Sequence, residues 1–195
     1  MSSSLIGWIN KNLFRSPPLD HYNMKKNALS FTCVDNFLDK DSLESLQKKM
    51  LSVSYAPAKA SDKVHYGYEH HFAVDHFKND PLLKKVKDTF HSSEDLKPVE
   101  IRAHLRHNTA QPHVHRDGVD DKECFSFLLY VKGDSLMYNG TGFCGLDKKL
   151  SSYIGFAENR AIFFNAGRIW HTDLQALGES SPRYSLNIFY HAPLD

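Results

Sequence analysis

The segment from Gln111 to Gly118 carries residue types that could bind a metal ion. His113, His115 and Asp117 are spaced two residues apart, so in an extended strand their side chains would lie on one face. Two imidazoles and a carboxylate are costly to cluster away from water unless a cation satisfies them, and a divalent metal is the usual partner. His115 and Asp117 would supply two ligands of such a site, and a third must come from elsewhere in the chain.

His171 is the candidate for that third ligand. It follows an apolar stretch at 162–164 and a turn at Gly167, and it lies 54 residues beyond Asp117. This separation leaves room for several strands that could return His171 to the first two ligands. Two histidines and one carboxylate form the facial ligand set of non-haem Fe(II) oxygenases, which keeps coordination positions open for catalysis.

A third segment, at 182–190, places polar side chains in a strand that otherwise suits burial. Alternation puts Arg183, Ser185 and Asn187 on one face of this strand. A buried guanidinium without a partner is strongly destabilising, so Arg183 requires an anion. A carboxylate ligand would fit its planar fork, and an internal salt bridge with an Asp or Glu is the alternative.

Together these motifs resemble the 2-oxoglutarate- and Fe(II)-dependent oxygenases, most closely the prolyl-4-hydroxylase-like branch. The matching elements are His115-Arg-Asp117, the distal His171 after an apolar strand, and Arg183-Tyr-Ser185 beyond it. The resemblance covers roughly residues 97 to 191. It implies a double-stranded β-helix, also called a jelly roll.

The resemblance also implies the ligands. Fe(II) would be bound by His115, Asp117 and His171, and the distal carboxylate of 2-oxoglutarate by Arg183 with Ser185. Tyr130 stands where the hydroxylase branch often has a tyrosine that reaches the same carboxylate.

The activity implied by the resemblance is that of a dioxygenase. The enzyme would consume 2-oxoglutarate and O2, release succinate and CO2, and hydroxylate a prolyl residue, an amino acid or another small molecule. The partner would accordingly be a small-molecule, peptide or protein substrate. The glycine-rich turn that the family commonly has ahead of His-x-Asp is absent from residues 105–112, so the substrate itself is not inferred.

Two other functional classes share part of this pattern. His113-Val-His115 also matches the His-x-His of cupins, which would make the protein a metal- or sugar-binding module, but the first following glutamate is Glu123. The oxidative nucleic-acid dealkylases place a second arginine six residues after the first, where this chain has Phe189. The formal net charge of +1 gives no basic groove, so nucleic acid is not expected as a partner.

The elements needed to position these residues are those of a mostly β (α+β) domain. From residue 97 onward, short alternating runs separated by turn residues predict an antiparallel sandwich or barrel. Two supporting helices are expected before it, one beginning at an Asp41–Glu44 capping box and one running from Asp80-Pro81 to about Ser92. Strands are expected at 29–34, 64–77 (as a long strand or hairpin), 99–106, 113–117, 124–132, 136–138, 153–156, 161–165 and 183–191.

Length and composition favour a single domain. The chain has 195 residues, which we divide into an N-terminal arm at 1–28, a helix and strand support at 29–96, and the jelly-roll core at 97–195. The three cysteines are far apart and are expected to be free thiols in a reducing compartment. No signal peptide is recognisable and the apolar runs are too short for a membrane helix, so we expect a soluble, cytoplasmic protein without a membrane partner.

Several residues near these motifs have roles that packing explains as well as function does. His113 is expected to be a hydrogen-bonding neighbour rather than a fourth ligand, because the facial triad is complete without it. The same question is open for Asn187, Arg168, Trp170 and the stripe formed by Tyr66, Tyr68 and His70.

Overall fold

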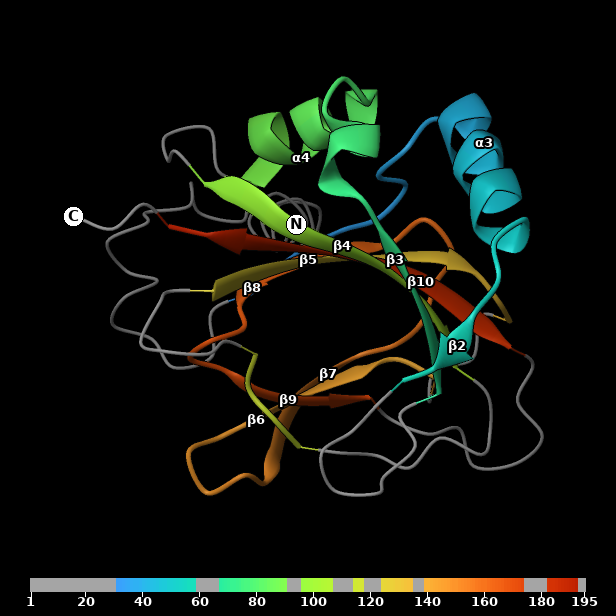
Figure 1. Cartoon of the computed structure of the whole chain (residues 1–195). Coiled ribbons are helices and arrows are strands. Elements are labelled where there is room, and N and C mark those ends of the chain that lie inside the picture. The colour runs from blue at the N-terminus through green and yellow to red at the C-terminus, as the bar shows by residue number, and fades with distance from the viewer. Residues whose placement is uncertain are drawn as a thin grey trace, which may run out of the picture.

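Two antiparallel β-sheets face each other, and two α-helices cover the outer side of the larger one (Figure 1). The computed structural model describes residues 31–58, 67–90, 96–106, 114–117, 124–134, 139–173 and 182–192. This arrangement confirms the predicted mostly β, jelly-roll class with supporting helices in the first half of the chain.

The larger sheet has seven strands and the smaller sheet has three. In spatial order, the larger sheet contains β1 (Phe31–Val34), β8 (Ala161–Asn165), β5 (Cys124–Lys132), β10 (Arg183–His191), β4 (Lys97–Arg106), β3 (Tyr68–Phe72) and β2 (Ala56–Pro57). The smaller sheet contains β7 (Leu150–Ile154), β6 (Thr141–Cys144) and β9 (Trp170–Asp173). Strand β10 lies between β4 and β5, so side chains from three distant segments share one surface of the larger sheet.

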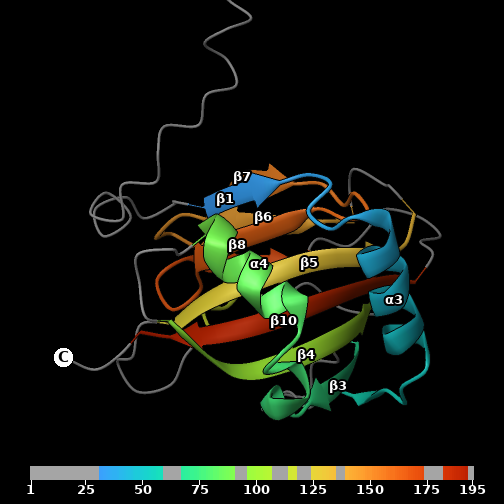
Figure 2. The same cartoon turned by 90° about the horizontal axis from the view of Figure 1, so that it is seen from above.

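The helices α3 (Lys40–Leu51) and α4 (Pro81–Phe90) lie on the face of the larger sheet that points away from the smaller sheet (Figures 1 and 2). Each buries one apolar stripe, as predicted: Leu46 and Met50 on α3, and Leu82, Val86 and Phe90 on α4. No helix in the described residues is both long and apolar enough to cross a membrane.

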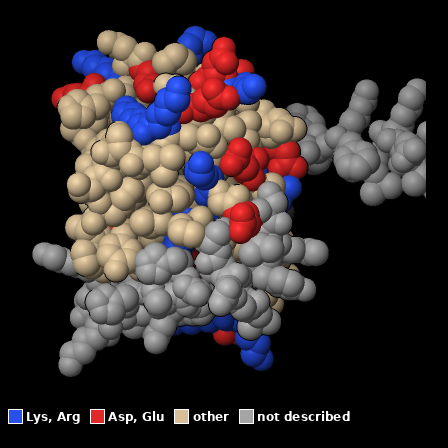
Figure 3. Space-filling model, turned by 90° about the vertical axis from the view of Figure 1, so that its right-hand side faces the viewer, with Lys and Arg blue, Asp and Glu red and all other residues tan. Residues whose placement is uncertain are grey.

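The solvent side of α3 is charged. Figure 3 shows the right-hand side of Figure 1, and side chains of both signs gather at the top of this face, where α3 lies. The exposed residues of this helix include Lys40, Asp41, Glu44 and Lys48. A polar outer face and an apolar inner face are typical of a helix that packs on a sheet.

The starts of the two helices test the predicted caps. Asp80 accepts a hydrogen bond from the backbone N–H of Leu82 at 2.9 Å, which confirms the predicted start of α4. The predicted capping box at Asp41 is wrong, because the N-cap of α3 is Asp39, whose Oδ1 accepts from the N–H of Ser42 at 2.9 Å. Asp39 has extended backbone angles, which an N-cap requires, whereas Asp41 already lies in the helix.

Two apolar clusters fill the interior. Alternation along β5 directs Phe127 and Leu129 toward the helices and Leu128 and Tyr130 into the space between the sheets. The cluster between the sheets fills only part of that space, and the remainder forms a polar cavity.

The strand predictions were confirmed where the alternating run is long. The strands β5, β8 and β10 have the predicted bounds, and β1 and β4 lie within three residues of them. The predicted strand at 153–156 is displaced to 150–154, and β2, β6 and β9 were not predicted because they are short and contain polar or small residues.

The prediction of a single long strand or hairpin at 64–77 is wrong for its second half. Strand β3 ends at Phe72, and Val74–Phe77 form a 3-10 helix, η1. This turn brings the fully buried Phe77 ring to 5.4 Å from that of Phe72, so core packing overrides the alternation. The predicted strand at 136–138, Tyr66, and the arm at 1–28 lie outside the described residues, and the division into arm, support and core stays a prediction.

Candidate metal centre and its cavity

A short backbone pairing brings the two distant histidines together. The N–H of His115 donates to the carbonyl of His171 at 2.9 Å, and the N–H of His171 donates back at 2.9 Å. The N–H of Asp117 donates to the carbonyl of Ala166 at 2.9 Å. The predicted strand at 113–117 is therefore reduced, within the described residues, to one bridge at His115, which holds this segment against β9.

His115, Asp117 and His171 form a compact set of potential metal ligands. One ligand atom from each lies within 4.8 Å of the others. Nε2 of His115 is 3.5 Å from Oδ1 of Asp117, and Nε2 of His171 is 3.3 Å from Oδ2. The three side chains that the sequence nominated as a triad are thus assembled, whereas His113 lies outside the described residues.

The tautomer of His171 indicates that a cation belongs between these atoms. Its Nδ1 lies 3.0 Å from the carbonyl oxygen of Ile169. A carbonyl only accepts, so Nδ1 carries the hydrogen, and in a neutral ring Nε2 then presents a lone pair to Asp117. A lone pair and a carboxylate at this distance repel each other unless a proton or a metal ion lies between them.

Asp117 is ionised despite its environment. Burial raises its pKa, but His115 and His171, when their rings are protonated, lower it by hydrogen bonding and by charge, so the pKa of Asp117 lies well below its usual range. The carboxylate is available to a cation throughout the neutral pH range.

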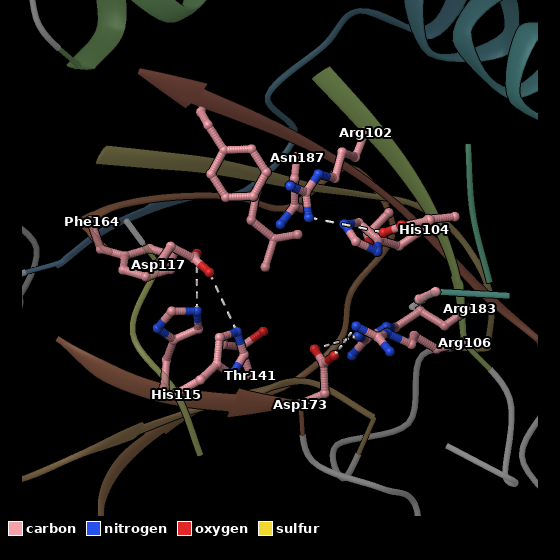
Figure 4. A pocket seen from close by; sticks show the side chains of 16 residues that line it. Arg102, His104, Arg106, His115, Asp117, Thr141, Phe164, Asp173, Arg183 and Asn187 are labelled. Atoms are coloured by element: carbon pink, nitrogen blue, oxygen red, sulfur yellow. Dashed lines mark hydrogen bonds and ion pairs between the residues drawn. The ribbon is translucent and has the colours of Figure 1, made fainter. Parts of the chain in front are cut away.

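The triad opens into a cavity of about 390 Å³ between the two sheets (Figure 4). His115 and Asp117 lie on one side of this cavity, and Arg106, Arg183 and Asp173 lie on the other. The lining residues are Ala58, Glu69, Arg102, His104, Arg106, His115, Asp117, Leu128, Thr141, Phe164, His171, Asp173, Arg183, Ser185, Asn187 and Phe189.

Arg183 is buried, with 2% of its side chain exposed, and it connects the two sheets. Its Nη1 donates to the carbonyls of Asn139 and Gly140, each at 3.0 Å, and its Nη2 donates to Oδ1 of Asp173 at 2.8 Å. A side chain at Gly140 would collide with the carbonyl of Ile154, so the close packing of residue 140 on the backbone at Ile154 requires glycine. Asp173 supplies the anion that Arg183 requires. This is the internal salt bridge that the sequence offered as the alternative to a carboxylate ligand.

Of the other residues considered for the co-substrate, Ser185 and Asn187 line the cavity and Tyr130 does not. Ser185 and Asn187 line the cavity beside Arg183, as the alternation predicted. Tyr130 is fully buried behind the cavity wall, where its hydroxyl is 2.7 Å from Oγ1 of Thr141 and its ring centroid 5.5 Å from the Arg183 guanidinium. Burial raises the pKa of Tyr130, which is therefore neutral. Thr141, rather than Tyr130, reaches the cavity.

The sequence interpretation missed five lining residues with ionisable side chains. They are Glu69 on β3, Arg102, His104 and Arg106 on β4, and Asp173 on β9. The β4 set was recognisable, because polar residues alternate with apolar ones along that strand as they do along β10. Asp173 shares the face of His171, but β9 itself was not predicted.

Four residues whose roles the sequence left open do not line the cavity. Tyr68 and His70 alternate with Glu69, and the His70 ring packs 4.7 Å from Phe72. Trp170 packs against cations, with the Arg116 guanidinium 4.5 Å and the Lys148 ammonium 4.2 Å from its ring centroid. Arg168 is not among the lining residues. These positions favour packing over substrate contact.

His104 gives a testable dependence of stability on pH. Both of its ring nitrogens are buried without a hydrogen-bond partner among the described residues. Burial, together with the charges of Arg106, Arg102 and Arg183, lowers its pKa from 6.5 to about 3, although Asp173 opposes the shift. Between these values the unfolded chain binds the extra proton, so the free energy of unfolding should fall as the pH drops below about 6.5.

Replacing His104 with glutamine should remove this contribution. Between pH 7 and pH 5 the wild type should lose on the order of 2 kcal/mol more than His104→Gln, as measured by urea denaturation. The exposed His76→Gln variant is the control and should follow the wild type. Parallel pH profiles for wild type and His104→Gln would contradict the assignment of a neutral buried imidazole.

The chain is similar to known proteins in its structure, whereas comparisons of its sequence found no match. No protein-family model matches the chain. No curated protein matches it either.

Several solved structures share its fold. A prolyl hydroxylase from Trichoplax adhaerens, in complex with a hypoxia inducible factor peptide fragment, has a TM-score of 0.64 and 13% identity over 88% of this chain and 86% of its own. HygX from Streptomyces hygroscopicus, with nickel, 2-oxoglutarate and hygromycin B bound, has a TM-score of 0.62 and 12% identity over 91% and 88%. The non-haem alpha-ketoglutarate-dependent epimerase SnoN, from nogalamycin biosynthesis, has a TM-score of 0.62 and 11% identity over 89% and 84%. The chain therefore has the jelly-roll fold of the 2-oxoglutarate- and Fe(II)-dependent oxygenases, the fold that prolyl hydroxylases also have.

Proposed function

We propose that this protein is a 2-oxoglutarate- and Fe(II)-dependent dioxygenase that hydroxylates a small-molecule, peptide or protein substrate. The observation that carries the proposal is the convergence of His115, Asp117 and His171 in the cavity that also contains Arg183. A metal-ligand set and a buried guanidinium in one cavity suit a co-substrate that has a metal-chelating end and a carboxylate end.

The donor set fits Fe(II). Two imidazole nitrogens and one carboxylate oxygen are the facial ligands that non-haem Fe(II) sites use. The hydrogen bond from His171 to Ile169 holds its Nε2 toward Asp117, and Asp117 is ionised, so the ligands are prepared for a cation. When bound, Fe(II) would supply the positions at which O2 is activated for oxidation of the substrate.

Arg183 and Ser185 would hold the distal carboxylate of 2-oxoglutarate. Arg183 is fixed by two backbone carbonyls, so its orientation is set before a ligand arrives. Tyr130 would contribute by orienting the Thr141 hydroxyl, which lines the same cavity. The rest of the wall would contact the substrate, and it combines apolar side chains such as Leu128 and Phe164 with the polar groups of Glu69 and Arg102.

The substrate classes are proposed from the lining of the cavity and from the ligands of the similar structures. The prolyl hydroxylase was solved with a peptide and HygX with hygromycin B, so this fold accepts both peptides and small molecules. A prolyl residue, an amino acid and another small molecule are therefore the candidates. Phe189 lines the cavity at the position where the nucleic-acid dealkylases carry their second arginine, which disfavours nucleic acid.

Anaerobic titration tests the proposal. Protein supplied with Fe(II) and 2-oxoglutarate should show the visible charge-transfer band of an iron-bound 2-keto acid, and exposure to air should then give slow, uncoupled formation of succinate. Glutarate lacks the keto group and serves as the control, which should give no band. If metal-replete protein gave neither band nor succinate, the assignment as a dioxygenase would be wrong.

A further inference from the structure

Asp173 bridges two arginines on the side of the cavity away from His115 and Asp117 (Figure 4). Its Oδ1 accepts from Nη2 of Arg183 at 2.8 Å, and its Oδ2 lies 2.9 Å from Nη2 of Arg106. The two arginines are register partners on β10 and β4. Like charges directly opposite each other destabilise a sheet, so the bridging carboxylate stabilises this pair. Asp173 therefore occupies an anion site that two guanidinium groups build.

The arginines around this site are already paired with acids. Asp173 pairs with Arg183 and Arg106, and Arg102 pairs with Glu100 at 2.6 Å and with Glu69 at 3.9 Å. A further carboxylate that binds Arg183 would therefore have to displace an acid of the chain. The Nε of Arg183 is buried without a partner among the described residues. This unused donor favours the binding of a carboxylate at Arg183.

Arg183 and Asp173 differ in how firmly they are held. Arg183 remains anchored by the carbonyls of Asn139 and Gly140 if its bond to Asp173 is broken. The Asp173 side chain is 32% exposed and stands at the end of β9, whereas that of Arg183 is 2% exposed. Asp173 is therefore the partner that can turn away while the guanidinium stays in place.

We propose that the carboxylate of Asp173 competes with the distal carboxylate of 2-oxoglutarate for Arg183 and Arg106. When 2-oxoglutarate binds, its distal carboxylate displaces that of Asp173. This inference rests on the proposed function. Because one carboxylate replaces another, the ligand gains only the difference between two similar sets of hydrogen bonds. Asp173 thereby sets the affinity for the co-substrate below the value that an unopposed arginine pair would give.

Removing the charge of Asp173 tests this competition. In protein loaded with redox-inert Ni(II), Asp173→Asn should bind 2-oxoglutarate roughly tenfold more tightly than the wild type in calorimetry. Its melting temperature should also rise more when 2-oxoglutarate is added, because the ligand then supplies the missing anion. Asp173→Glu keeps the charge and should not show this gain in affinity. Asp88→Asn, an exposed change on α4, is the matched control and should leave the dissociation constant unchanged.

The possible outcomes separate this inference from the proposed function. If the wild type binds 2-oxoglutarate and Asp173→Asn binds it equally or more weakly, Asp173 positions Arg183 and does not compete, so only this inference fails. If neither the wild type nor any variant binds it, the proposed function fails and the inference with it. Folding of Asp173→Asn only in the presence of 2-oxoglutarate would support the inference, and failure of the ligand to restore folding would overturn it.

Discussion

Replacing Asp117 with alanine should lower the affinity for Fe(II) at least about a hundredfold and leave the fold intact. The change removes the carboxylate toward which both imidazoles point, and loss of even a residue that only supports a metal ligand costs roughly 10- to 100-fold in affinity. The backbone bond from Asp117 to Ala166 does not depend on the side chain, so this segment should stay in place. Anaerobic calorimetry measures the affinity, and thermal melting of the metal-free protein checks the fold.

Asp88→Ala provides the matched control for this variant. It removes an exposed carboxylate on α4, far from the metal ligands in the chain, and should leave Fe(II) binding unchanged. Tight Fe(II) binding by Asp117→Ala would place the metal on other residues. That result would revive the cupin-like metal- or sugar-binding module, in which His113 and His115 are ligands.

Replacing Arg183 with alanine should weaken 2-oxoglutarate binding by at least about a hundredfold and spare Fe(II) binding. A guanidinium bonded to a carboxylate makes two charge-assisted hydrogen bonds, each of which contributes roughly 1.5 to 3 kcal/mol. The hydrogen-bond partners of Arg183 are Asn139, Gly140 and Asp173, and none of them is a member of the triad, so the metal affinity should be unchanged. Calorimetry with Ni(II)-loaded protein gives both dissociation constants.

The same variant should be less stable, because three hydrogen bonds are lost, two of them buried. Asp173 stays paired with Arg106, so we expect a decrease of roughly 3 kcal/mol in the free energy of unfolding and no collapse of the fold. Arg160→Ala is the control, because it removes an arginine that pairs with Asp35 and does not line the cavity. An equal loss of metal and 2-oxoglutarate binding, with the fold intact, would contradict the role of Arg183.

Arg183→Ala and Asp173→Asn should change the affinity for 2-oxoglutarate in opposite directions. Loss of Arg183 removes an attraction for the distal carboxylate, whereas loss of the Asp173 charge removes its competitor. A purely structural salt bridge would instead respond to both changes with the same loss of stability and of binding. The pair of variants therefore distinguishes a ligand site from a structural ion pair.

Local sequence patterns predicted most of the larger sheet and both helices. The strands β5, β8 and β10 were recognisable because burial on one or both faces imposes a run of apolar or alternating residues. The strands β6 and β9 escaped because four residues are too few to establish a period, and glycine and threonine in β6 and aspartate in β9 weaken it further. The end of β3 was missed because packing of Phe77 replaced the strand by a turn.

The sequence by itself determined which residue types were available for a site. The spacing of His115 and Asp117, the distant His171, and the common face of Arg183, Ser185 and Asn187 are local properties, so they could be read before the fold was known. The chain indeed brings the first three together, and it directs the second three into the same cavity.

The tertiary structure alone decided how those residues are paired. Whether Arg183 meets a ligand or an internal acid depends on the position of β9 relative to β10, which belong to different sheets. The low pKa of His104 likewise depends on burial and on arginines from neighbouring strands. Such contacts join residues that are distant in sequence, and their energies depend on distance and desolvation, which no local pattern specifies. The competition between Asp173 and a ligand carboxylate could therefore be inferred only once the sheets were in place.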